Sequence, residues 1–285
     1  MAASTAAVQG AVVAPARRHG STRWPLYLLA AALTLFFILP IYLIAVAAVS
    51  PPADISGFPK ALYPRHISLD TLVFFLTFPG VVPSMINSVA VALLTLVLST
   101  AIGAPAGYGL ARFVFRGRDA FKIAILISRA FPIAILAVPL AVTFINWNLY
   151  DTVFAVALVH TTLALPTTIL ISSSIFLAVP YDLEEAAWTL GCTPMTAFFR
   201  VVLPLAIPGI AAASIFTFVL SWNEVFAASI LTVQNRTLPA QVLASLSESP
   251  LPYRFAGGFV LILPSMVFIF IIRRYLLNMW GRVIK

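Results

Sequence analysis

Three ionisable side chains, Arg129, His160 and Glu224, interrupt long apolar stretches of the sequence. Burying such groups among apolar residues is costly, so they commonly mark proton relays, ion pathways or contacts with a polar solute. Each also has a structural interpretation. Arg129 can reach an interface, pair with Glu224 or line a pathway, and His160 can form hydrogen bonds between packed helices.

The other polar residues do not indicate catalysis. Glu184 and Glu185 are the only paired carboxylates, and adjacent side chains on a helix point apart. Serine, histidine and aspartate residues are scattered over separate apolar runs and loops. Cys192 is the single cysteine and the three histidines are far apart in sequence, so we expect no disulfide and no metal centre. The sequence therefore predicts a non-catalytic chain that binds no cofactor itself.

Composition indicates the elements that position these residues. Of the 285 residues, 61% are hydrophobic and 9% are charged, whereas an ordinary soluble domain is about one quarter charged. A helix needs roughly 20 apolar residues to cross a bilayer. We expect six transmembrane helices within residues 26–49, 85–111, 123–145, 152–179, 205–233 and 255–272. Gly103 and Gly107 have the G-x3-G spacing that allows helices to approach closely.

The distribution of Lys and Arg predicts how these helices are oriented. Of the 17 basic residues, twelve lie in the two terminal segments or in the segments after the second and fourth apolar runs. The other side carries four, namely Lys60, Arg65, Arg236 and Arg254. Because basic residues concentrate on the cytoplasmic side, we expect both termini and residues 180–204 in the cytoplasm. The net charge of +8 then reflects orientation rather than nucleic-acid binding.

Residues 180–204 show a helix, turn and helix pattern. Leu183, Ala186, Ala187 and Leu190 fall at the i, i+3, i+4 and i+7 positions of one helical face. Gly191 follows where a glycine would end the helix, and Thr193-Pro194 is typical of a second helix start. Periodicity alone favours an amphipathic loop that lies on the membrane surface.

The residue types in this loop add a more specific resemblance. Glu185-Ala186-Ala187, three residues, Gly191, nine residues and then Val201-Val202-Leu203-Pro204 resemble the EAA loop of ABC importer permeases, with valine in place of isoleucine. In that family the loop is a pair of coupling helices that docks into a groove of a separate ATPase. The resemblance assigns ATPase coupling to Glu184, Glu185, Ala186, Ala187, Leu190, Gly191 and Pro194.

Other segments resemble the carbohydrate branch of this family, the second permeases of maltose and trehalose type. They are Asn87-Ser88, residues 129–132, Trp222-Asn223-Glu224 and the C-terminal residues 281–285. The branch often has Asp-Gly-Ala where this chain has Leu190-Gly191-Cys192, so a charge near the docking surface is missing. The resemblance extends over most of the chain from the first span onward.

The resemblance implies an all-α integral membrane protein with the type I importer permease fold and six transmembrane helices. Residues 1–23 would form a disordered cytoplasmic tail, and residues 24–285 a permease domain with its coupling loop at 180–204. The location would be the cytoplasmic membrane of a bacterium or archaeon.

The partners implied are a homologous second permease, an ABC ATPase dimer that binds ATP and Mg, an extracytoplasmic substrate-binding protein and membrane lipid. Residues 50–84 and 234–254 are long enough to meet the binding protein. The sequence has no G-x4-G-K-[ST] motif to hold phosphates, as expected where a separate subunit hydrolyses ATP. No nucleic-acid partner is expected.

In such an importer, the solute would be a sugar or polyol, and the candidate pathway residues are Asn87, Arg129, His160, Trp222, Asn223 and Glu224. Asn223 and Glu224 could hydrogen-bond sugar hydroxyls, while Trp222 could stack on a sugar or pack against a helix. The alternative is a self-contained ion- or proton-coupled transporter that uses Arg129, His160 and Glu224 as a relay. Such a protein has no reason to carry the EAA spacing.

Overall fold

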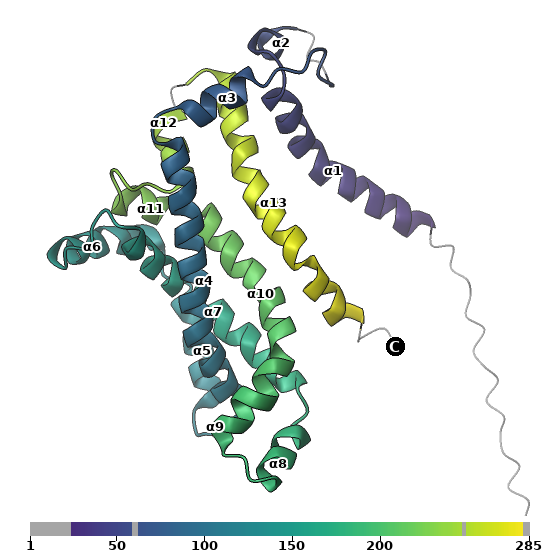
Figure 1. Cartoon of the computed structure of the whole chain (residues 1–285), viewed down its shortest axis with the longest axis vertical. Coiled ribbons are helices and arrows are strands. Elements are labelled where there is room, and N and C mark those ends of the chain that lie inside the picture. The colour runs from purple at the N-terminus through teal and green to yellow at the C-terminus, as the bar shows by residue number, and fades with distance from the viewer. Residues whose placement is uncertain (1–23, 59–61, 247–248, 282–285) are drawn as a thin grey trace, which may run out of the picture. The chain divides into compact units, whose positions relative to one another are not determined.

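The computed structural model of the chain describes residues 24–58, 62–246 and 249–281. The expected tail at 1–23 and residues 282–285 lie outside these ranges. Every regular element within them is helical (Figure 1). The long helices are α1 (Trp24–Ala48), α4 (Val81–Arg112), α7 (Val153–Ala178), α10 (Leu203–Asn223) and α13 (Leu251–Gly281). The shorter ones are α2 (Pro52–Ser56), α3 (Asp70–Thr77), α5 (Arg118–Ser128), α6 (Ile133–Asn146), α8 (Asp182–Thr189), α9 (Pro194–Ala197), the π-helix η1 (Phe198–Val202), α11 (Phe226–Leu231) and α12 (Leu238–Leu246).

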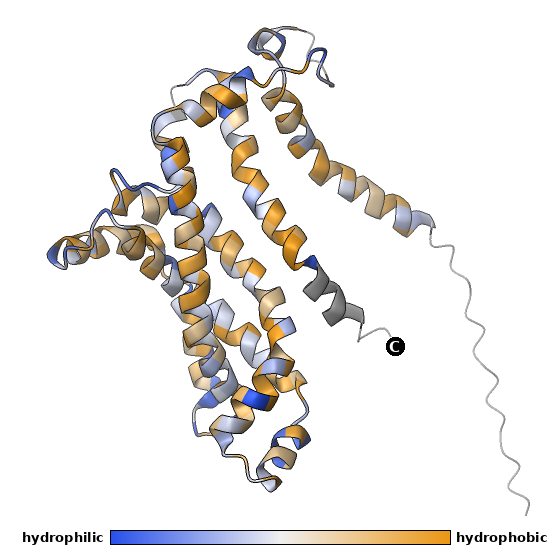
Figure 2. Ribbon diagram, in the orientation of Figure 1, coloured by the Kyte–Doolittle hydropathy of each residue, from blue (hydrophilic) through white to orange (hydrophobic). Residues whose placement is uncertain are grey.

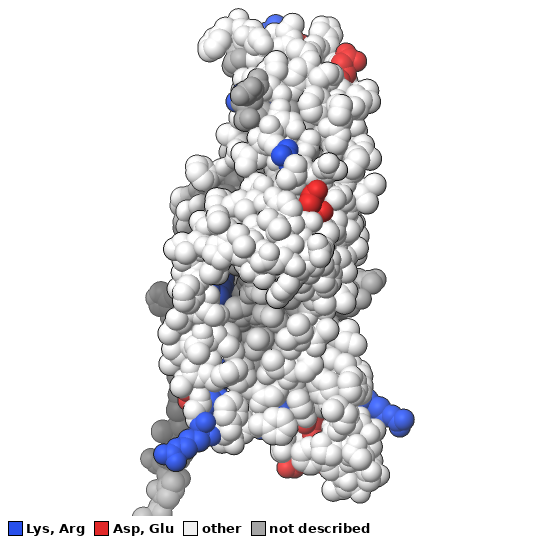
Figure 3. Space-filling view, turned by 90° about the vertical axis from the view of Figure 1, so that its left-hand side faces the viewer, with Lys and Arg blue, Asp and Glu red and all other residues white. Residues whose placement is uncertain are grey.

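The helices have the length and composition of membrane spans. Among the described residues, five helical stretches are long and apolar enough to cross a bilayer, and the bent pair α5 and α6 brings the total to six. Figure 2 shows apolar residues distributed along the long helices. On the face in Figure 3, most of the surface is uncharged, and charged side chains are few near its middle. These helices confirm the predicted all-α membrane fold. A helix that is apolar on all sides suits lipid.

Two of the predicted spans are broken rather than continuous. The third bends by 85° between α5 and α6, where Pro132 lacks an N–H group and restricts the residue before it. The fifth ends as α10 at Asn223, because Glu224 adopts an extended backbone conformation before α11 begins. Because both predicted spans are mainly apolar across the break, hydropathy alone predicted neither break.

The chain divides into two units between Tyr42 and Leu43, within α1. In the first unit, the described residues form one helix with apolar side chains exposed on all sides, including Leu29 and Phe36. The second unit contains all the other helices and its own core.

The core of the second unit depends on close packing of α4 against α7. A Cβ atom added to Gly107 would lie 2.7 Å from the Ser172 Cβ atom and 2.8 Å from the Ile169 carbonyl oxygen. A Cβ atom on Gly103 would lie 2.8 Å from the Thr168 side chain. The G-x3-G spacing thus lets the two backbones meet, as predicted.

Two ends of this unit are stabilised by separate apolar clusters. Around Trp222, residues of α3, α4, α10, α12 and α13 pack together, including Phe75 and Leu238. Around Phe176 and Phe198, residues of α4, α7, η1 and α10 pack together. Figure 1 shows α8 and α9 at one end of α4, and α3 and α12 at its other end.

Candidate functional site

The predicted helix, turn and helix pattern of residues 180–204 is confirmed in its central part. Gly191 has a φ of 86°, a left-handed conformation that glycine adopts without strain. Its N–H group donates to the Trp188 carbonyl at 2.9 Å, and the Cys192 N–H group donates to that of Ala187 at 3.0 Å. These two bonds form a Schellman motif that ends α8. Thr193 then caps α9, since its side chain accepts the Thr196 N–H group at 3.3 Å.

The outer surface of this loop combines a carboxylate with exposed apolar groups. Five of the predicted coupling residues are exposed, namely Glu185, Ala186, Leu190, Gly191 and Pro194. The Leu190 side chain is 86% exposed, and Met195 is 66% exposed. Exposed apolar groups gathered at a turn are a feature of protein contact surfaces.

Glu184 and Ala187, to which the resemblance also assigns ATPase coupling, are buried and face the interior instead. Glu184 is fully buried. Its carboxylate accepts hydrogen bonds from the Tyr108 hydroxyl group at 2.8 Å and from Arg112. Sequence analysis missed both partners, although Arg112 is the first charged residue after a long apolar run.

A polar cavity of about 280 Å³ lies where the two broken spans meet α7. The break between α5 and α6 contributes Ser128, Arg129 and Phe131, and the end of α10 contributes Asn223 and Glu224. The remaining lining residues are Thr162, Leu163, Pro166 and Leu220. Helix breaks at membrane depth are tolerated where they line a cavity, so this is the strongest candidate for part of a solute pathway.

The cavity therefore brings Arg129 together with Asn223 and Glu224, which are far from it in sequence. Among the described residues, no ion pair includes Arg129. The amide of Asn223 donates to the Val219 carbonyl at 2.9 Å. Ser128 and Thr162 add hydroxyl groups that sequence analysis did not single out, and only their closeness to Arg129 and His160 could have suggested them.

His160 does not line this cavity. It is fully buried, with Nδ1 at 2.9 Å from the Ser221 hydroxyl and Nε2 at 3.0 Å from Glu224. The Ser221 hydroxyl lies 3.4 Å from that of Thr95, so the network joins α4, α7 and α10. Its serine, histidine and glutamate have the order of a hydrolytic triad. Because His160 and Ser221 are buried, the network is suited to helix packing, one of the roles expected for His160.

Two other candidate pathway residues, Trp222 and Asn87, lie outside this cavity. Trp222 is 1% exposed, and its indole N–H group donates to the Leu261 carbonyl at 2.9 Å. Its ring stacks on Phe218 and packs α10 against α13. The Asn87 amide donates to the Arg236 carbonyl at 3.2 Å and so fastens α4 to the loop before α12.

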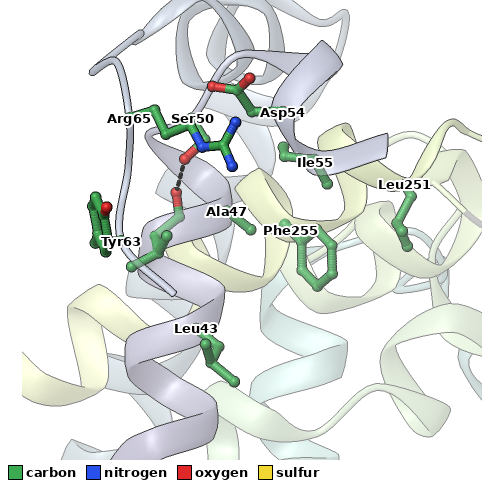
Figure 4. A pocket seen from close by; sticks show the side chains of 10 residues that line it. Leu43, Ala47, Ser50, Asp54, Ile55, Tyr63, Arg65, Leu251 and Phe255 are labelled. Atoms are coloured by element: carbon green, nitrogen blue, oxygen red, sulfur yellow. Dashed lines mark hydrogen bonds between the residues drawn. The ribbon is translucent and has the colours of Figure 1, made fainter. Parts of the chain in front are cut away.

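A second cavity, of about 220 Å³, is unrelated to these residues. Figure 4 shows its apolar wall, which includes Leu43, Leu251 and Phe255, with Asp54 and Arg65 near its rim. It lies within the second unit, where residues of α1 from Leu43 onward meet α2 and α13, and it contains none of the predicted site residues.

Comparison with known proteins identifies the family and the fold. Residues 99–279 match the family described as the binding-protein-dependent transport system inner membrane component. The trehalose transport system permease protein SugB of Mycobacterium tuberculosis is 36% identical, over 67% of this chain and 72% of that protein. The diacetylchitobiose uptake system permease protein NgcG of Streptomyces coelicolor is 32% identical, over 74% and 70%.

The fold itself has a solved counterpart. A chain of a bacterial ABC transporter that imports the acidic polysaccharide alginate aligns with a TM-score of 0.70 and 20% identity, over 90% of this chain and 98% of that one. None of these comparisons supports the self-contained secondary transporter. The chain belongs to the binding-protein-dependent inner-membrane permease family, and it is a multi-pass membrane permease of the ABC importer type whose relatives include sugar permeases.

Proposed function

We propose that this chain is one of two permease subunits in an ATP-driven importer of a sugar or a related polyhydroxylated solute. The observation that carries the proposal is the exposed turn between α8 and α9, which presents Glu185, Leu190 and Gly191 at one end of the bundle with the EAA spacing. A separate ATPase dimer, which binds ATP and Mg, would dock there. In this arrangement the ATPase hydrolyses ATP, and this chain has no hydrolytic activity of its own.

The distribution of basic residues supports a cytoplasmic position for this docking turn. The segments at the α8 end carry five described basic residues, and those at the α12 end carry three. The five are Arg112, Arg116, Arg118, Lys122 and Arg200, and the three are Arg65, Arg236 and Arg254. By the positive-inside rule, the α8 end would face the cytoplasm and the α12 end the outside. Residues 50–84 and 234–254 would then meet the extracytoplasmic binding protein of a bacterial inner-membrane importer.

The polar cavity supports a direct role in the solute pathway. Arg129 offers several N–H donors with no ion-pair partner among the described residues. The hydroxyl groups of Ser128 and Thr162 donate to the carbonyls of Ile125 and Val159, and their oxygens can still accept from a solute. Asn223 uses one amide donor on Val219 and has a second donor and a carbonyl acceptor. Such groups match sugar hydroxyls. A homologous second permease would supply the opposite wall, and the named substrates of relatives, trehalose and diacetylchitobiose, favour a disaccharide class.

The deciding experiment is a pull-down of the tagged chain from detergent-solubilised native membranes. We expect an ATPase and a second permease to accompany the wild type, and the ATPase to be lost from Glu185→Lys. Asp119→Lys is the matched control, because Asp119 is also an exposed carboxylate on a short helix near this end of α4. Recovery of the wild type without an ATPase, or retention of the ATPase by Glu185→Lys, would overturn the docking assignment.

A further inference from the structure

The buried carboxylate of Glu184 is unusual for a short helix that otherwise faces outward. Of the three acidic residues in α8, Asp182 and Glu185 are exposed and Glu184 is fully buried. Burying a charged carboxylate is costly unless it is paired and hydrogen-bonded. The charge of Glu184 therefore needs a partner inside the protein. An apolar residue at this position would be buried at a lower cost in desolvation free energy.

The partner is Arg112, the last residue of α4. Its guanidinium group forms an ion pair with Glu184, with side chains that are 8% and 1% exposed. The same guanidinium donates to the Val179 carbonyl, which follows α7, at 2.9 Å. It also lies 5.4 Å from the centre of the Tyr181 ring. One side chain of α4 thus holds both the end of α7 and the start of α8.

Tyr108 completes the cluster from one turn earlier on α4. Its hydroxyl group donates to the second oxygen of Glu184 at 2.8 Å. Its ring lies 4.5 Å from that of Phe198 in η1 and 5.5 Å from that of Phe176 in α7. The hydrogen bond to Glu184 therefore fixes α8 against a packed aromatic group as well as against the ion pair.

The other end of α4 is fastened by polar contacts too. The Ser88 hydroxyl accepts the Leu238 N–H group at 2.7 Å, and Asn87 donates to the Arg236 carbonyl at 3.2 Å. Between these ends, α4 packs closely on α7 at Gly103 and Gly107. At about 1.5 Å per residue, its 32 residues give a helix of about 48 Å, long enough to cross a bilayer.

We propose that Glu184, Arg112 and Tyr108 form a positioning cluster that fixes the docking helix α8 to α4. Covalent connections join α8 only to α7 and, through α9 and η1, to α10. The cluster adds α4, so that a displacement of α8 by the ATPase moves α4 with it and reaches the loop before α12. This inference rests on the proposed docking function, but it assigns Glu184 to positioning and not to ATPase contact.

The test uses the complete complex, with the native Cys192 replaced by serine and spin labels on cysteines at Thr189 and Val114. Both of these residues are exposed, one on α8 and one just after α4. We expect a narrow distance distribution in the otherwise wild-type chain and a broad one in Glu184→Gln. Asp119→Asn removes one partner of an exposed ion pair with Lys122 and should leave the distribution narrow. Arg112→Lys keeps the positive charge opposite Glu184, so its distance distribution should stay nearly as narrow as that of the otherwise wild-type chain.

The second readout is solute uptake per ATP hydrolysed, with trehalose, maltose and diacetylchitobiose tried as probes. Glu184→Gln should still bring down the ATPase, yet its uptake per ATP should fall roughly tenfold, a usual size for coupling between sites. If no probe is transported, the label distance decides alone. If Glu184→Gln does not accumulate, Tyr108→Phe replaces it, because that variant removes one hydrogen bond and keeps the ion pair.

The outcomes separate this inference from the proposed function. An ATPase absent from the wild-type complex would refute the docking function itself. With docking intact, a narrow distribution in Glu184→Gln, or in Tyr108→Phe where that variant is used, would overturn the positioning cluster. A broad distribution with unchanged uptake per ATP would also overturn it, because α8 would then need no fixed contact with α4.

Discussion

The Nε2 atom of His160 lies 3.0 Å from the Oε2 atom of Glu224, a contact that joins α7 to the break between α10 and α11. The same carboxylate accepts the N–H groups of Ala227 at 2.9 Å and Ala228 at 3.2 Å. Glu224 thus satisfies two of the N–H groups in the first turn of α11, which have no partner within that helix. The arrangement holds the break in place at the wall of the polar cavity.

Glu224→Ala should therefore destabilise the protein by about 1–2 kcal/mol, because a buried cap and the His160 contact are both lost. Glu224→Gln keeps an oxygen that can accept from Ala227 and should retain uptake. Thermal unfolding of the purified protein and uptake by cells measure the two effects. Uptake abolished in Glu224→Gln, with normal stability, would instead show that transport requires the carboxylate itself and not only its oxygen that caps α11.

Sequence analysis identified Arg129, Glu224 and Trp222, but it could not predict which of them line the cavity and which pack helices together. Hydropathy placed Arg129 and Glu224 in spans, and it could not reveal the breaks at residues 129–132 and 224–225 that turn both towards one cavity. A proline after Phe131 was a visible signal for the first break. The second depends on a side chain capping the next helix, which no apolar pattern records. Trp222 illustrates the same limit, because stacking on sugar and packing on α13 require the same residue type.

The docking loop was more predictable because its signals are local. Gly191 and Thr193-Pro194 direct the backbone through short-range conformational preferences, and the structure has the turn where they indicate it. The burial of Glu184 was not predictable in this way. It depends on Arg112 and Tyr108, more than 70 residues earlier in the sequence, since hydrogen bonds link positions separated by 72 and 76 residues.

Gly107→Ala should weaken the packing between α4 and α7. The new methyl group would lie within 2.8 Å of the backbone of Ile169 and Ser173, which can yield only if the helices separate. We expect a loss of about 1–3 kcal/mol in unfolding free energy. Gly109→Ala is the control on the same helix, because its nearest neighbour would be Phe113 at 3.9 Å, and it should gain up to about 1 kcal/mol. Similar melting temperatures for both variants would argue against close packing at Gly107.

Gly191→Pro should abolish uptake while the protein still enters the membrane. Proline is limited to a φ near −65° and has no N–H group, whereas Gly191 has a φ of 86° and donates to Trp188. Gly117→Pro is the matched control, because Gly117 also has a positive φ, 92°, and lies in open space outside the docking loop. Membrane fractionation measures the insertion of each variant, and uptake measures its transport. Wild-type uptake in Gly191→Pro would show that the turn is not needed for coupling.

Asp151 should make stability depend on pH. Partial burial acts to raise the pKa of its carboxyl group, but the N–H groups of Asn235, Val233 and Gln234, with a smaller effect of Arg236, hold that pKa below its usual range. The N–H contacts are 2.8–3.2 Å long and join the start of α7 to the loop before α12.

A group whose pKa is lower in the folded protein adds stability above its unfolded pKa of about 3.9 and loses that contribution as the pH falls through the folded value. Asp151→Asn should therefore lower the melting temperature at pH 7, and the difference from wild type should shrink as the pH falls below about 4. Asparagine tolerates the φ of 58° at this position, so the substitution tests charge rather than backbone strain. A difference that is equally large at pH 7 and pH 3 would instead assign the effect to shape, because below the unfolded pKa of about 3.9 the contribution of the charge to stability should already have decreased.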